Sequence, residues 1–404
     1  MTVLQESSED PYEREPSRDE RLIVHSDTPM NAECPARLLT ESYLTPVSLF
    51  YIRHHHPVPY LTPAQLDMYR LEIDVSAYDQ MGRVLTLTME DLKQLKKVEV
   101  VTTMQCSGNR RTGFNDFRRT SGTTWGQGAI STAKWGGVKL SDVLLLAGLH
   151  DPIQAQEVWG MEHVRFSGLD GMMSSIPIEK AVNPYGDVIL AYEMNGEPLP
   201  RDHGGPIRVI VPGYSAVRNV KWVQRIEVAA TEAEGPWQRG LNYKTLPPNV
   251  VDAGDVDIAK MPPMTEASVF SGITKITTSH RKGSIKPGDT ILVKASGWAW
   301  AGGGRNIVRV DITSNNGETW NTATLKEGAV QRFGRAWAWT FWECKDIPAK
   351  VGEDGKVELA SKAVDMAFNV QPENSDHSWN VRGLGNNSWF KIKQTVCSPK
   401  DSAP

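Results

Sequence analysis

The sequence has few cysteines and no long apolar run. Its 404 residues include only Cys34, Cys106, Cys344 and Cys397, which are widely spaced and form no C-x-x-C pair. This pattern indicates neither a disulfide framework nor a zinc site, and it is typical of a reducing compartment. No stretch approaches the roughly 18 apolar residues that cross a bilayer, and the charged N-terminus has no signal-peptide core. We therefore expect a soluble intracellular protein of the cytoplasm, with no membrane partner and no evident organelle address.

An excess of charge of one sign is also lacking. The chain has 44 Lys and Arg against 48 Asp and Glu, which leaves a formal net charge of −4 at pH 7. It therefore has no global basic field of the kind that holds nucleic acid, and we expect no nucleic-acid partner. The glycine-rich run 301–305 lacks the lysine and the G-x-x-x-x-G-K-[ST] spacing of a P-loop, which argues against ATP chemistry. Any cationic site must be local.

Length and composition predict two domains. Hydrophobic residues make up 40% of the chain, which is ample for sizeable cores at this length. Residues 1–30 are polar and charged, so we expect a flexible, loosely attached N-terminal tail. The proline-rich passage 247–263 is typical of a linker between domains. The sequence thus predicts a first domain over residues 31–246, a second over 264–396 and a short tail over 397–404.

The two domains differ in their secondary-structure signals. In the first, Leu71–Val75 alternates with period two, Thr88 opens a capping box, and Ser141 is a good N-cap for a helix that Gly148 would end. In the second, short alternating runs recur, and the turn residues at 315–317 (Asn-Asn-Gly) are a strong hairpin signal. We therefore predict an α+β chain, with a mixed α/β domain followed by an immunoglobulin-like β-sandwich.

The stretch with the most specific chemistry is 104–111, Met-Gln-Cys-Ser-Gly-Asn-Arg-Arg. The preceding run 98–103 is β-branched enough for a buried strand, so Cys106 would sit just past its end, where sheet-based sites usually open. A thiolate is the soft ligand that a heavy metal prefers, and the two arginines supply positive charge suited to an oxyanion. The pattern indicates a pocket in which a metal and an anion meet.

This motif resembles the molybdenum-binding segment of the sulfite oxidase family, in which Cys-Ala-Gly-Asn-Arg-Arg is usual and the cysteine binds molybdenum. Ser107 replaces the usual alanine. The likeness runs from about Asn31 to Trp389 and includes the segments 192–196, 201–204 and 369–374. It implies a molybdenum–pterin cofactor in the first domain, which would be the catalytic one, and homodimerisation through the second.

The resemblance also implies which residues act in the reaction. The candidate catalytic residues are Arg53, Cys106, Arg111, Trp125, Tyr243 and Arg382, with Cys106 as the metal ligand. The three arginines would converge on a small dianion. Taken alone, Trp125 is better explained as a core tryptophan, while Arg382 is equally consistent with a surface arginine and Tyr243 with packing beside a linker.

The expected cofactor contacts are spread over the first domain. The candidates are Phe50, Arg53, His54, His55, Cys106, Asp170, His203, Arg208, Asn219, Val220 and Lys221. A buried phosphate dianion needs Arg or Lys together with neutral donors, and this set supplies both. Singly, Asp170 is also consistent with a turn cap, His203 with a core histidine and Lys221 with an exposed strand position. Their joint match to the family favours cofactor binding.

Three successive histidines, His54, His55 and His56, raise the alternative of a metal site. In a strand His54 and His55 would face opposite sides, so a triple-histidine zinc site is geometrically awkward. Solvent-facing or hydrogen-bonded histidines are the plain alternative. The resemblance implies a third interpretation, a Phe-x-x-Arg-Asn-His element that contacts the pterin. Arg53 and His55 match that element, and His54 replaces the usual asparagine.

The resemblance implies a sulfite oxidase that converts sulfite to sulfate at a mononuclear molybdenum–pterin centre. The sequence shows no haem-domain, flavin or nicotinamide signature, so we expect no haem and no flavin. Electrons would then pass to molecular oxygen or to a separate acceptor such as a cytochrome. One alternative is the molybdenum portion of a nitrate reductase. The other is a metal-free oxyanion-binding scaffold protein, against which the intact Cys106 argues.

Overall fold

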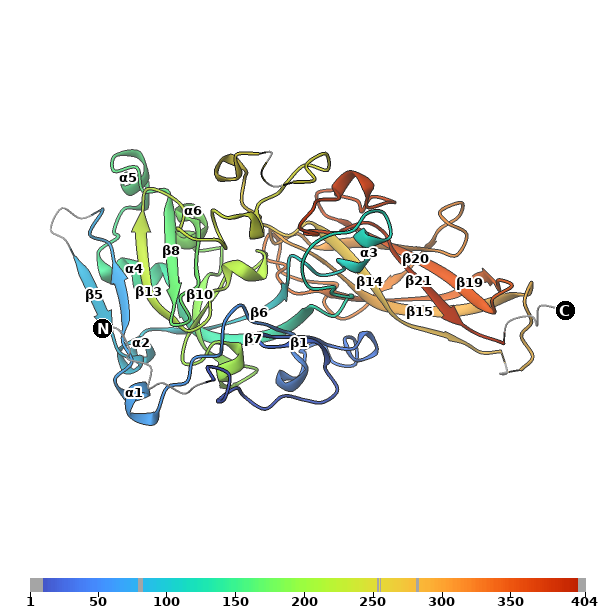
Figure 1. Ribbon diagram of the computed structural model, residues 1–404, viewed down its shortest axis with the longest axis horizontal. Coiled ribbons are helices and arrows are strands. Elements are labelled where there is room, and N and C mark those ends of the chain that lie inside the picture. Colours follow the sequence, from blue (N-terminus) through green and yellow to red (C-terminus); the bar gives the residue numbers. More distant parts are fainter. Residues whose placement is uncertain (1–9, 79–82, 253, 255, 281–282, 399–404) are drawn as a thin grey trace.

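The computed structural model describes residues 10–78, 83–252, 254, 256–280 and 283–398. Two parts of the chain lie side by side in Figure 1. The part at the left carries most of the helices around mixed sheets, and the part at the right consists mainly of long strands. Nothing in the described helices combines the length and the apolar character that a bilayer crossing requires.

Two five-stranded sheets form the framework of the first part. One has the order β11-β10-β7-β6 with β12 paired to β10, and consists of β6 (Lys97–Gln105), β7 (Ile130–Lys139), β10 (Ile189–Met194), β11 (Glu197–Pro198) and β12 (Arg208–Ile210). The other has the order β5-β4-β13-β8-β9, and consists of β4 (Leu71–Asp74), β5 (Val84–Leu87), β8 (His163–Gly168), β9 (Met173–Pro177) and β13 (Val223–Ala229). In the second sheet β13 runs parallel to β4, whereas the other pairs are antiparallel.

Short helices connect these strands. They are α1 (Pro63–Asp67), α2 (Met89–Gln94), α3 (Thr112–Asn115), α4 (Leu140–Ala147), α5 (Pro152–Glu157) and α6 (Ile178–Val182). The predicted capping box opens α2. Thr88 Oγ1 accepts from the Asp91 N–H at 3.0 Å, and the Asp91 carboxylate accepts from the Thr88 N–H at 2.8 Å. Gly148 ends α4 with a φ of 116°, as predicted.

The prediction that Ser141 caps α4 is wrong. The helix already begins at Leu140, and its N-cap Lys139 makes no side-chain capping bond. The physical reason is that β7 continues directly into α4, where the Leu140 N–H donates to the Val188 carbonyl at 3.0 Å. A tertiary partner therefore satisfies a backbone donor that a capping side chain would otherwise serve.

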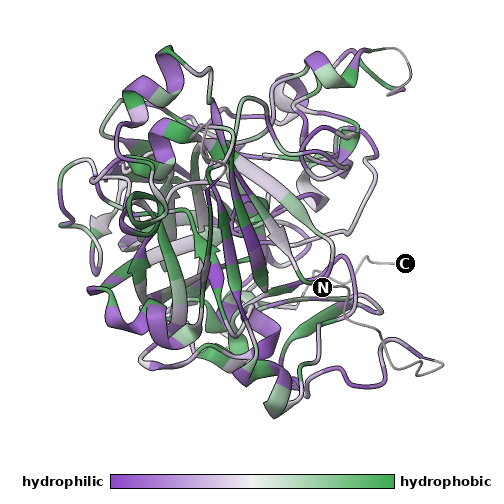
Figure 2. Cartoon of the chain, turned by 90° about the vertical axis from the view of Figure 1, so that its left-hand side faces the viewer, coloured by the Kyte–Doolittle hydropathy of each residue, from purple (hydrophilic) through white to green (hydrophobic). Residues whose placement is uncertain are grey.

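The apolar core of the first part sets the direction of the site residues. Strands of both sheets and α4 contribute to it, and Ile207, Val209 and Val211 are buried within it. Because side chains alternate along a strand, Arg208 and Ile210 point to the other side of β12, where Ile210 joins the buried cluster that contains Cys106. Figure 2 shows the strands inside this part as largely hydrophobic.

Residues 10–30 are not loosely attached, contrary to the prediction. A three-stranded sheet of order β1-β2-β3 is formed by β1 (Ile23–Asp27), β2 (Met30–Glu33) and β3 (Ile52–Arg53). Upstream of it, Arg18 forms a salt bridge with Asp202 at 2.8 Å. This ion pair and the burial of Leu22 in an apolar cluster hold the segment to the first part. Residues 1–9 of that tail and residues 399–404 of the C-terminal tail lie outside the described residues.

Two antiparallel four-stranded sheets form the second part. One has the order β14-β15-β19-β18, with β14 (Val269–Thr278), β15 (Thr290–Ala301), β18 (Thr324–Leu325) and β19 (Thr340–Lys350). The other has the order β17-β16-β20-β21, with β16 (Ile307–Thr313), β17 (Asn321–Thr322), β20 (Lys356–Asp365) and β21 (Phe390–Thr395). Ile273, Val310 and Leu359 belong to the apolar core that both sheets share. At the predicted turn between β16 and β17, Asn316 and Gly317 have φ values of 53° and 93°.

The passage 247–263 connects the two parts, and its two ends lie close together. The Thr245 N–H donates to the Pro262 carbonyl at 3.2 Å and the Met264 N–H donates to the Tyr243 carbonyl at 2.8 Å, so both ends of the passage 247–263 lie together. The domain boundaries placed there stay a prediction. The predicted fold class, a mixed α/β part followed by an antiparallel β-sandwich, is confirmed.

Candidate active site

Cys106 lies just past the end of β6, as predicted. Its N–H donates to the Ala129 carbonyl at 3.0 Å, and its Sγ accepts from the Gly108 N–H at 3.4 Å. The side chain is 4% exposed. Beyond it the chain reverses, because Arg110 has a positive φ of 62° and its N–H donates to the Gly126 carbonyl at 2.6 Å. The thiol is therefore fixed in a buried turn at a strand end.

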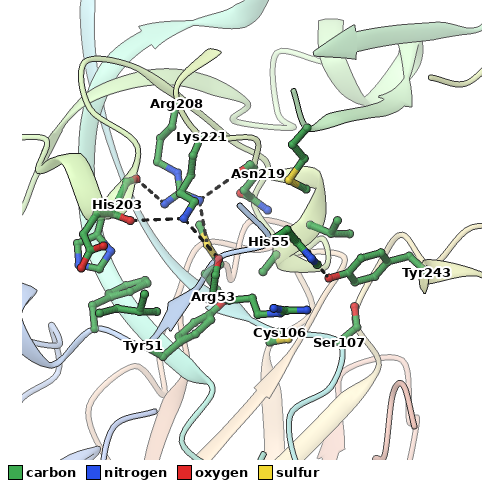
Figure 3. Close-up of a pocket in the computed structure, with 17 residues that line it drawn as sticks. Tyr51, Arg53, His55, Cys106, Ser107, His203, Arg208, Asn219, Lys221 and Tyr243 are labelled. Atoms are coloured by element: carbon green, nitrogen blue, oxygen red, sulfur yellow. Dashed lines mark hydrogen bonds between the residues drawn. The ribbon is translucent and has the colours of Figure 1, made fainter. Parts of the chain in front are cut away.

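Two adjoining cavities open beside this thiol, with empty volumes, mouths included, of about 590 and 490 Å³. The first, called the large cavity, is shown in Figure 3 and is lined by the predicted residues Phe50, Arg53, His55, Cys106, His203, Arg208, Asn219 and Lys221, and also by Tyr243. The second, called the arginine cavity, is lined by Arg53, Cys106, Arg111, Trp125, Tyr243 and Arg382, the whole predicted catalytic set.

A row of charged and polar groups stands in and behind the wall of the large cavity. Burial lowers the pKa of Lys221 to about 7, and its ammonium contacts Nδ1 of His54. Burial also lowers the pKa of His54 to about 3, and its Nε2 lies 2.8 Å from Asp202 Oδ1. Arg18 donates to both carboxylate oxygens of Asp202, at 2.9 and 2.8 Å. Burial alone would raise the pKa of Asp202, but its hydrogen bonds with His54 and Arg18 hold it well below its usual range.

His203 and Arg208 extend the polar lining of the large cavity (Figure 3). Arg208 donates from Nη1 to the His203 carbonyl at 2.8 Å and from Nη2 to the Asn219 carbonyl at 2.9 Å. Its Nε is buried without a hydrogen-bond partner among the described residues. Burial lowers the pKa of Arg208 to about 10 and that of His203 to about 4. At neutral pH the cavity thus contains a buried cation with an unused donor and a neutral imidazole.

Glycines allow Arg111 to reach the arginine cavity. Its Nε donates to the carbonyl oxygens of Arg382 and Gly383, both at 3.2 Å. A Cβ added at Gly108 would lie 2.6 Å from the Arg111 guanidinium, and one at Gly383 would lie 2.7 Å from the Arg111 side chain. Only residues without a Cβ permit this approach, which explains why the chain has glycine at both positions.

Neither Arg53, Arg111 nor Arg382 forms an ion pair within the described part of the chain. Arg53 donates to Asn31 Oδ1 at 2.7 Å, and Arg382 donates to Asn242 Oδ1 at 2.8 Å. Burial lowers the pKa of Arg111 and of Arg382, yet guanidinium groups stay protonated in proteins. Neutral oxygens therefore position the guanidinium groups of the arginine cavity but do not neutralise their positive charge.

Tyr243 and Trp125 form further parts of this lining. Tyr243 lines both cavities, and its Oη lies 3.1 Å from Nε2 of His55. Burial raises the pKa of Tyr243 and lowers that of His55 to about 2, so the phenol is protonated and the imidazole neutral. Trp125 is fully buried, and its ring edge packs against His25 of β1 with 4.9 Å between ring centroids. The N-terminal sheet therefore supports one wall of the arginine cavity.

Three of the predicted cofactor residues line neither cavity. His54 lies behind Lys221, which it contacts through Nδ1. Val220 is 1% exposed and packs in the apolar core. Asp170 accepts from the Met172 N–H at 3.1 Å, which is the turn-capping contact named as the alternative. The structure places these three in supporting positions.

Sequence reasoning missed several lining residues. Tyr51, Met104, Ser107, Met172 and Asp202 also line the large cavity, and Thr123 and Asn242 also line the arginine cavity. Most of them are within two positions of a residue that was named. Because functional residues gather on loops beside strand ends, adjacency to Cys106 and to Tyr243 was the available signal for Ser107 and Asn242.

The large cavity fits an anionic, polar cofactor that brings a metal. Tyr51 Oη and Arg208 Nε are buried polar atoms without a partner among the described residues, and such atoms are normally satisfied. Arg208 and Lys221 supply the charge that a phosphate requires. The described residues contain no group of three or more His, Cys, Asp or Glu that would hold a metal. Cys106 is the soft ligand that the lining of this cavity offers to a metal.

Comparisons with known proteins cover both parts of the chain. Residues 55–237 match the family model of an oxidoreductase molybdopterin binding domain, and residues 265–397 match that of a Mo-co oxidoreductase dimerisation domain. The mitochondrial sulfite oxidase of Rattus norvegicus is 42% identical over 394 residues, which cover 96% of this chain and 68% of that protein. The sulfite oxidase of Arabidopsis thaliana is 38% identical over 395 residues, 94% of this chain and 95% of that protein. The solved structure of the sulfane dehydrogenase SoxCD from Paracoccus pantotrophus is similar with a TM-score of 0.71 at 25% identity, covering 95% of this chain and 89% of that one.

Proposed function

The chain belongs to the sulfite oxidase family of molybdenum enzymes, and we propose that it oxidises sulfite to sulfate at a molybdenum–pterin centre beside Cys106. The observation that carries this proposal is the arginine cavity, where three guanidinium groups without an ion-pair partner in the described residues surround an opening next to a buried thiol. Partly buried charge of this kind favours a small oxyanion over a neutral molecule. The same observation argues against a scaffold role, which needs no thiol at that place.

In this proposal the large cavity holds the cofactor. The Cys106 thiolate binds the metal, Arg208 and Lys221 neutralise the phosphate, and His203 and Asn219 add neutral polar contacts. When bound, the molybdenum–pterin group supplies two-electron oxygen-atom transfer, which no side chain provides. A bound dianion also explains why two cations are buried together, since it would offset the desolvation that lowers the pKa of both.

The arginine cavity holds the substrate. Arg53, Arg111 and Arg382 bind and orient the sulfite dianion beside the thiol. Because Coulomb attraction grows with the charge of the ligand, three cations favour a dianion over monovalent nitrate. Trp125 is fully buried and forms an apolar wall that keeps the site small. This charge argument separates the proposed activity from the nitrate reductase alternative.

Tyr243 donates a hydrogen bond to an oxygen of the bound anion. Burial raises the pKa of Tyr243, so its phenol keeps the proton at neutral pH and acts as a donor. The neutral His55, 3.1 Å away, fixes the position of the phenol. Such a preorganised donor in a water-poor cavity strengthens the hold on a charged ligand without a further cation.

The remaining assignments complete the proposal. Sulfite and water are consumed, and sulfate, two protons and two electrons are produced. The electrons leave to molecular oxygen or to a separate acceptor such as a cytochrome. We assign cofactor binding to residues 31–246 and homodimerisation to residues 264–396, with 247–263 as the linker.

Metal and pterin analysis combined with a turnover assay tests the proposal. Purified protein is analysed for molybdenum and released pterin, and sulfite-dependent reduction is followed with oxygen, with cytochrome c and with ferricyanide. Near-stoichiometric molybdenum with sulfite turnover supports the proposal, and the preferred acceptor defines the electron partner. Molybdenum with nitrate turnover alone would overturn it in favour of a nitrate reductase. A folded protein that takes up no molybdenum in a cofactor-producing host would leave the scaffold alternative.

A further inference from the structure

Tyr51 reaches the large cavity from the segment that precedes Arg53. Its N–H donates to Ser131 Oγ at 3.2 Å, and its ring stacks on Phe50 with 5.5 Å between centroids. The side chain is 4% exposed and lines the large cavity together with Cys106 (Figure 3). Tyr51 is therefore held rigidly on both sides, and its hydroxyl has little freedom to seek a partner elsewhere.

The Tyr51 hydroxyl is buried without a hydrogen-bond partner in the described part of the chain. Three other tyrosines differ, of which Tyr69 and Tyr243 are buried and Tyr43 is partly buried. Tyr43 donates to the Trp339 carbonyl at 2.9 Å, Tyr69 donates to a backbone carbonyl, and Tyr243 pairs with a histidine. A buried hydroxyl without a partner loses the hydrogen bonds it makes to water in the unfolded chain, so its presence needs an explanation.

None of the described residues places an acceptor within hydrogen-bond distance of this hydroxyl. Burial raises the pKa of Tyr51 well above its usual range, so the hydroxyl keeps its proton and has a hydrogen bond to donate. The ionisable groups that act on it are Cys106, Arg208, Tyr243 and Arg53. A guanidinium carries only donors and cannot accept that hydrogen bond. The missing acceptor must therefore come from a molecule that enters the large cavity.

We propose that Tyr51 is a further cofactor-binding residue, whose hydroxyl donates a hydrogen bond to an oxygen or sulfur atom of the bound molybdenum–pterin group on the Cys106 side of the large cavity. This inference rests on the proposed function, since it takes the occupant of the large cavity to be that cofactor. Tyr51 lines the large cavity but not the arginine cavity. Its role is therefore to retain the cofactor and not to bind sulfite.

The test uses two substitutions that each remove one tyrosine hydroxyl, which is buried in Tyr51 and partly buried in Tyr43. Tyr51→Phe removes the hydroxyl without a protein partner, and Tyr43→Phe removes one that already has a protein acceptor. Wild type and both variants are prepared with cofactor, and without it from a host that cannot make the pterin. Thermal unfolding is measured for both forms, and the release of pterin from the loaded form is followed by fluorescence.

The two variants should behave differently. Tyr51→Phe should leave the cofactor-free form as stable as wild type, or more so, and should release pterin about five- to tenfold faster from the loaded form. Tyr43→Phe should lower the unfolding midpoint of both forms by the same amount, about 1 to 3 °C, without changing pterin release. The Michaelis constant for sulfite should be unchanged in Tyr51→Phe.

Two results would overturn the inference alone. One is pterin release from Tyr51→Phe at the wild-type rate, and the other is an equal loss of stability in its cofactor-free and loaded forms. Either would show that the hydroxyl makes no bond to the cofactor, while molybdenum and turnover in the wild type would still support the proposed function. A wild-type protein that binds no pterin at all would overturn both.

Discussion

The large cavity and the arginine cavity share Arg53, His55, Cys106 and Tyr243 but are otherwise assembled from the chain in different ways. The large cavity takes five polar lining residues from 202–221, and the others come from 50–55, the Cys106 motif and Tyr243. The arginine cavity combines segments as far apart as Arg53 and Arg382, and so draws on both parts of the chain. One site is complete within a single folded part, whereas the other exists only where the two parts meet.

The charged side chains of the two cavities also differ in the partners that they contact. In the wall of the large cavity, Lys221, His54, Asp202 and Arg18 contact one another in a row. In the arginine cavity, the guanidinium groups contact amide and carbonyl oxygens, as Arg382 does with Asn242. A cofactor that stays bound can be held by charge that is already partly balanced. An anion that exchanges at every turnover needs charge that the protein leaves available.

Contacts between the two parts fix the shape of the arginine cavity. The Gly385 N–H donates to the Ser107 carbonyl at 2.8 Å, and Asn386 Nδ2 donates to the Arg110 carbonyl at 2.9 Å. The cysteine motif in the first part is thus bonded directly to the segment that carries Arg382. Arg111 and Arg382 can therefore be placed together only when both parts are folded and docked.

Cys106→Ser changes a residue that lines both cavities, and we expect the largest effect from it. Sulfite turnover should fall by at least about a thousandfold, because a serine hydroxyl is not the soft anionic ligand that the metal requires. Pterin content should fall much less, since Arg208 and Lys221 are unchanged. Turnover, the thiolate-to-metal absorption and pterin content are measured on the same preparation. A variant with wild-type turnover would show that Cys106 does not hold the metal.

Arg382→Ala should affect the arginine cavity, where the substrate binds, and leave the large cavity unchanged. The Michaelis constant for sulfite should rise by about ten- to a hundredfold, because one charged contact to the anion is lost, while pterin content stays at the wild-type level. Steady-state kinetics over a range of sulfite concentrations measures the change. Arg118→Ala is the matched control, since Arg118 packs on the Trp379 ring at 4.7 Å and lines neither cavity. An equal change in both variants would place Arg382 outside the substrate site.

Arg18→Ala should affect the large cavity, where the cofactor binds, and leave the arginine cavity unchanged. It leaves the partly buried Asp202 carboxylate with His54 as its remaining side-chain partner, so the free energy of unfolding should fall by about 2 kcal/mol. Pterin release should become faster, and the Michaelis constant for sulfite should stay the same. Denaturant unfolding and pterin fluorescence measure these effects. The control is Arg21→Ala, which breaks the exposed ion pair with Asp19 and should change none of these three quantities. A higher Michaelis constant for sulfite in Arg18→Ala would show that the two cavities do not act independently.

His54→Asn tests the neutral histidine behind the large cavity through pH. Burial lowers the pKa of His54 from 6.5 to about 3, so its share of stability is fully present above pH 6.5 and is lost as the pH falls from 6.5 toward 3. At pH 5 this loss amounts to about 2 kcal/mol in the wild type. The decrease in unfolding free energy between pH 7 and pH 5 should therefore be about 2 kcal/mol smaller in the variant. Equal decreases would mean that His54 titrates alike in the folded and unfolded chain.

Several parts of the site followed from local sequence. The β-branched run before Cys106 predicted a strand end at the thiol. The family resemblance named six of the residues that line the arginine cavity. The misses have a common cause. Ser141 and the segment 10–30 were judged from their own composition, but partners far away in the sequence decide how both are held.

The sequence by itself determined those features that depend on residues a few positions apart: the capping box at Thr88, the turn at Gly317, and the thiol that follows β6. Only the tertiary structure decided that Arg53 and Arg382 share a cavity and that the Tyr51 hydroxyl is left without a partner. The physical reason is the range of the interactions. Strand periodicity and helix capping act over a few residues, whereas the neighbours of a buried side chain are set by the packing of distant segments.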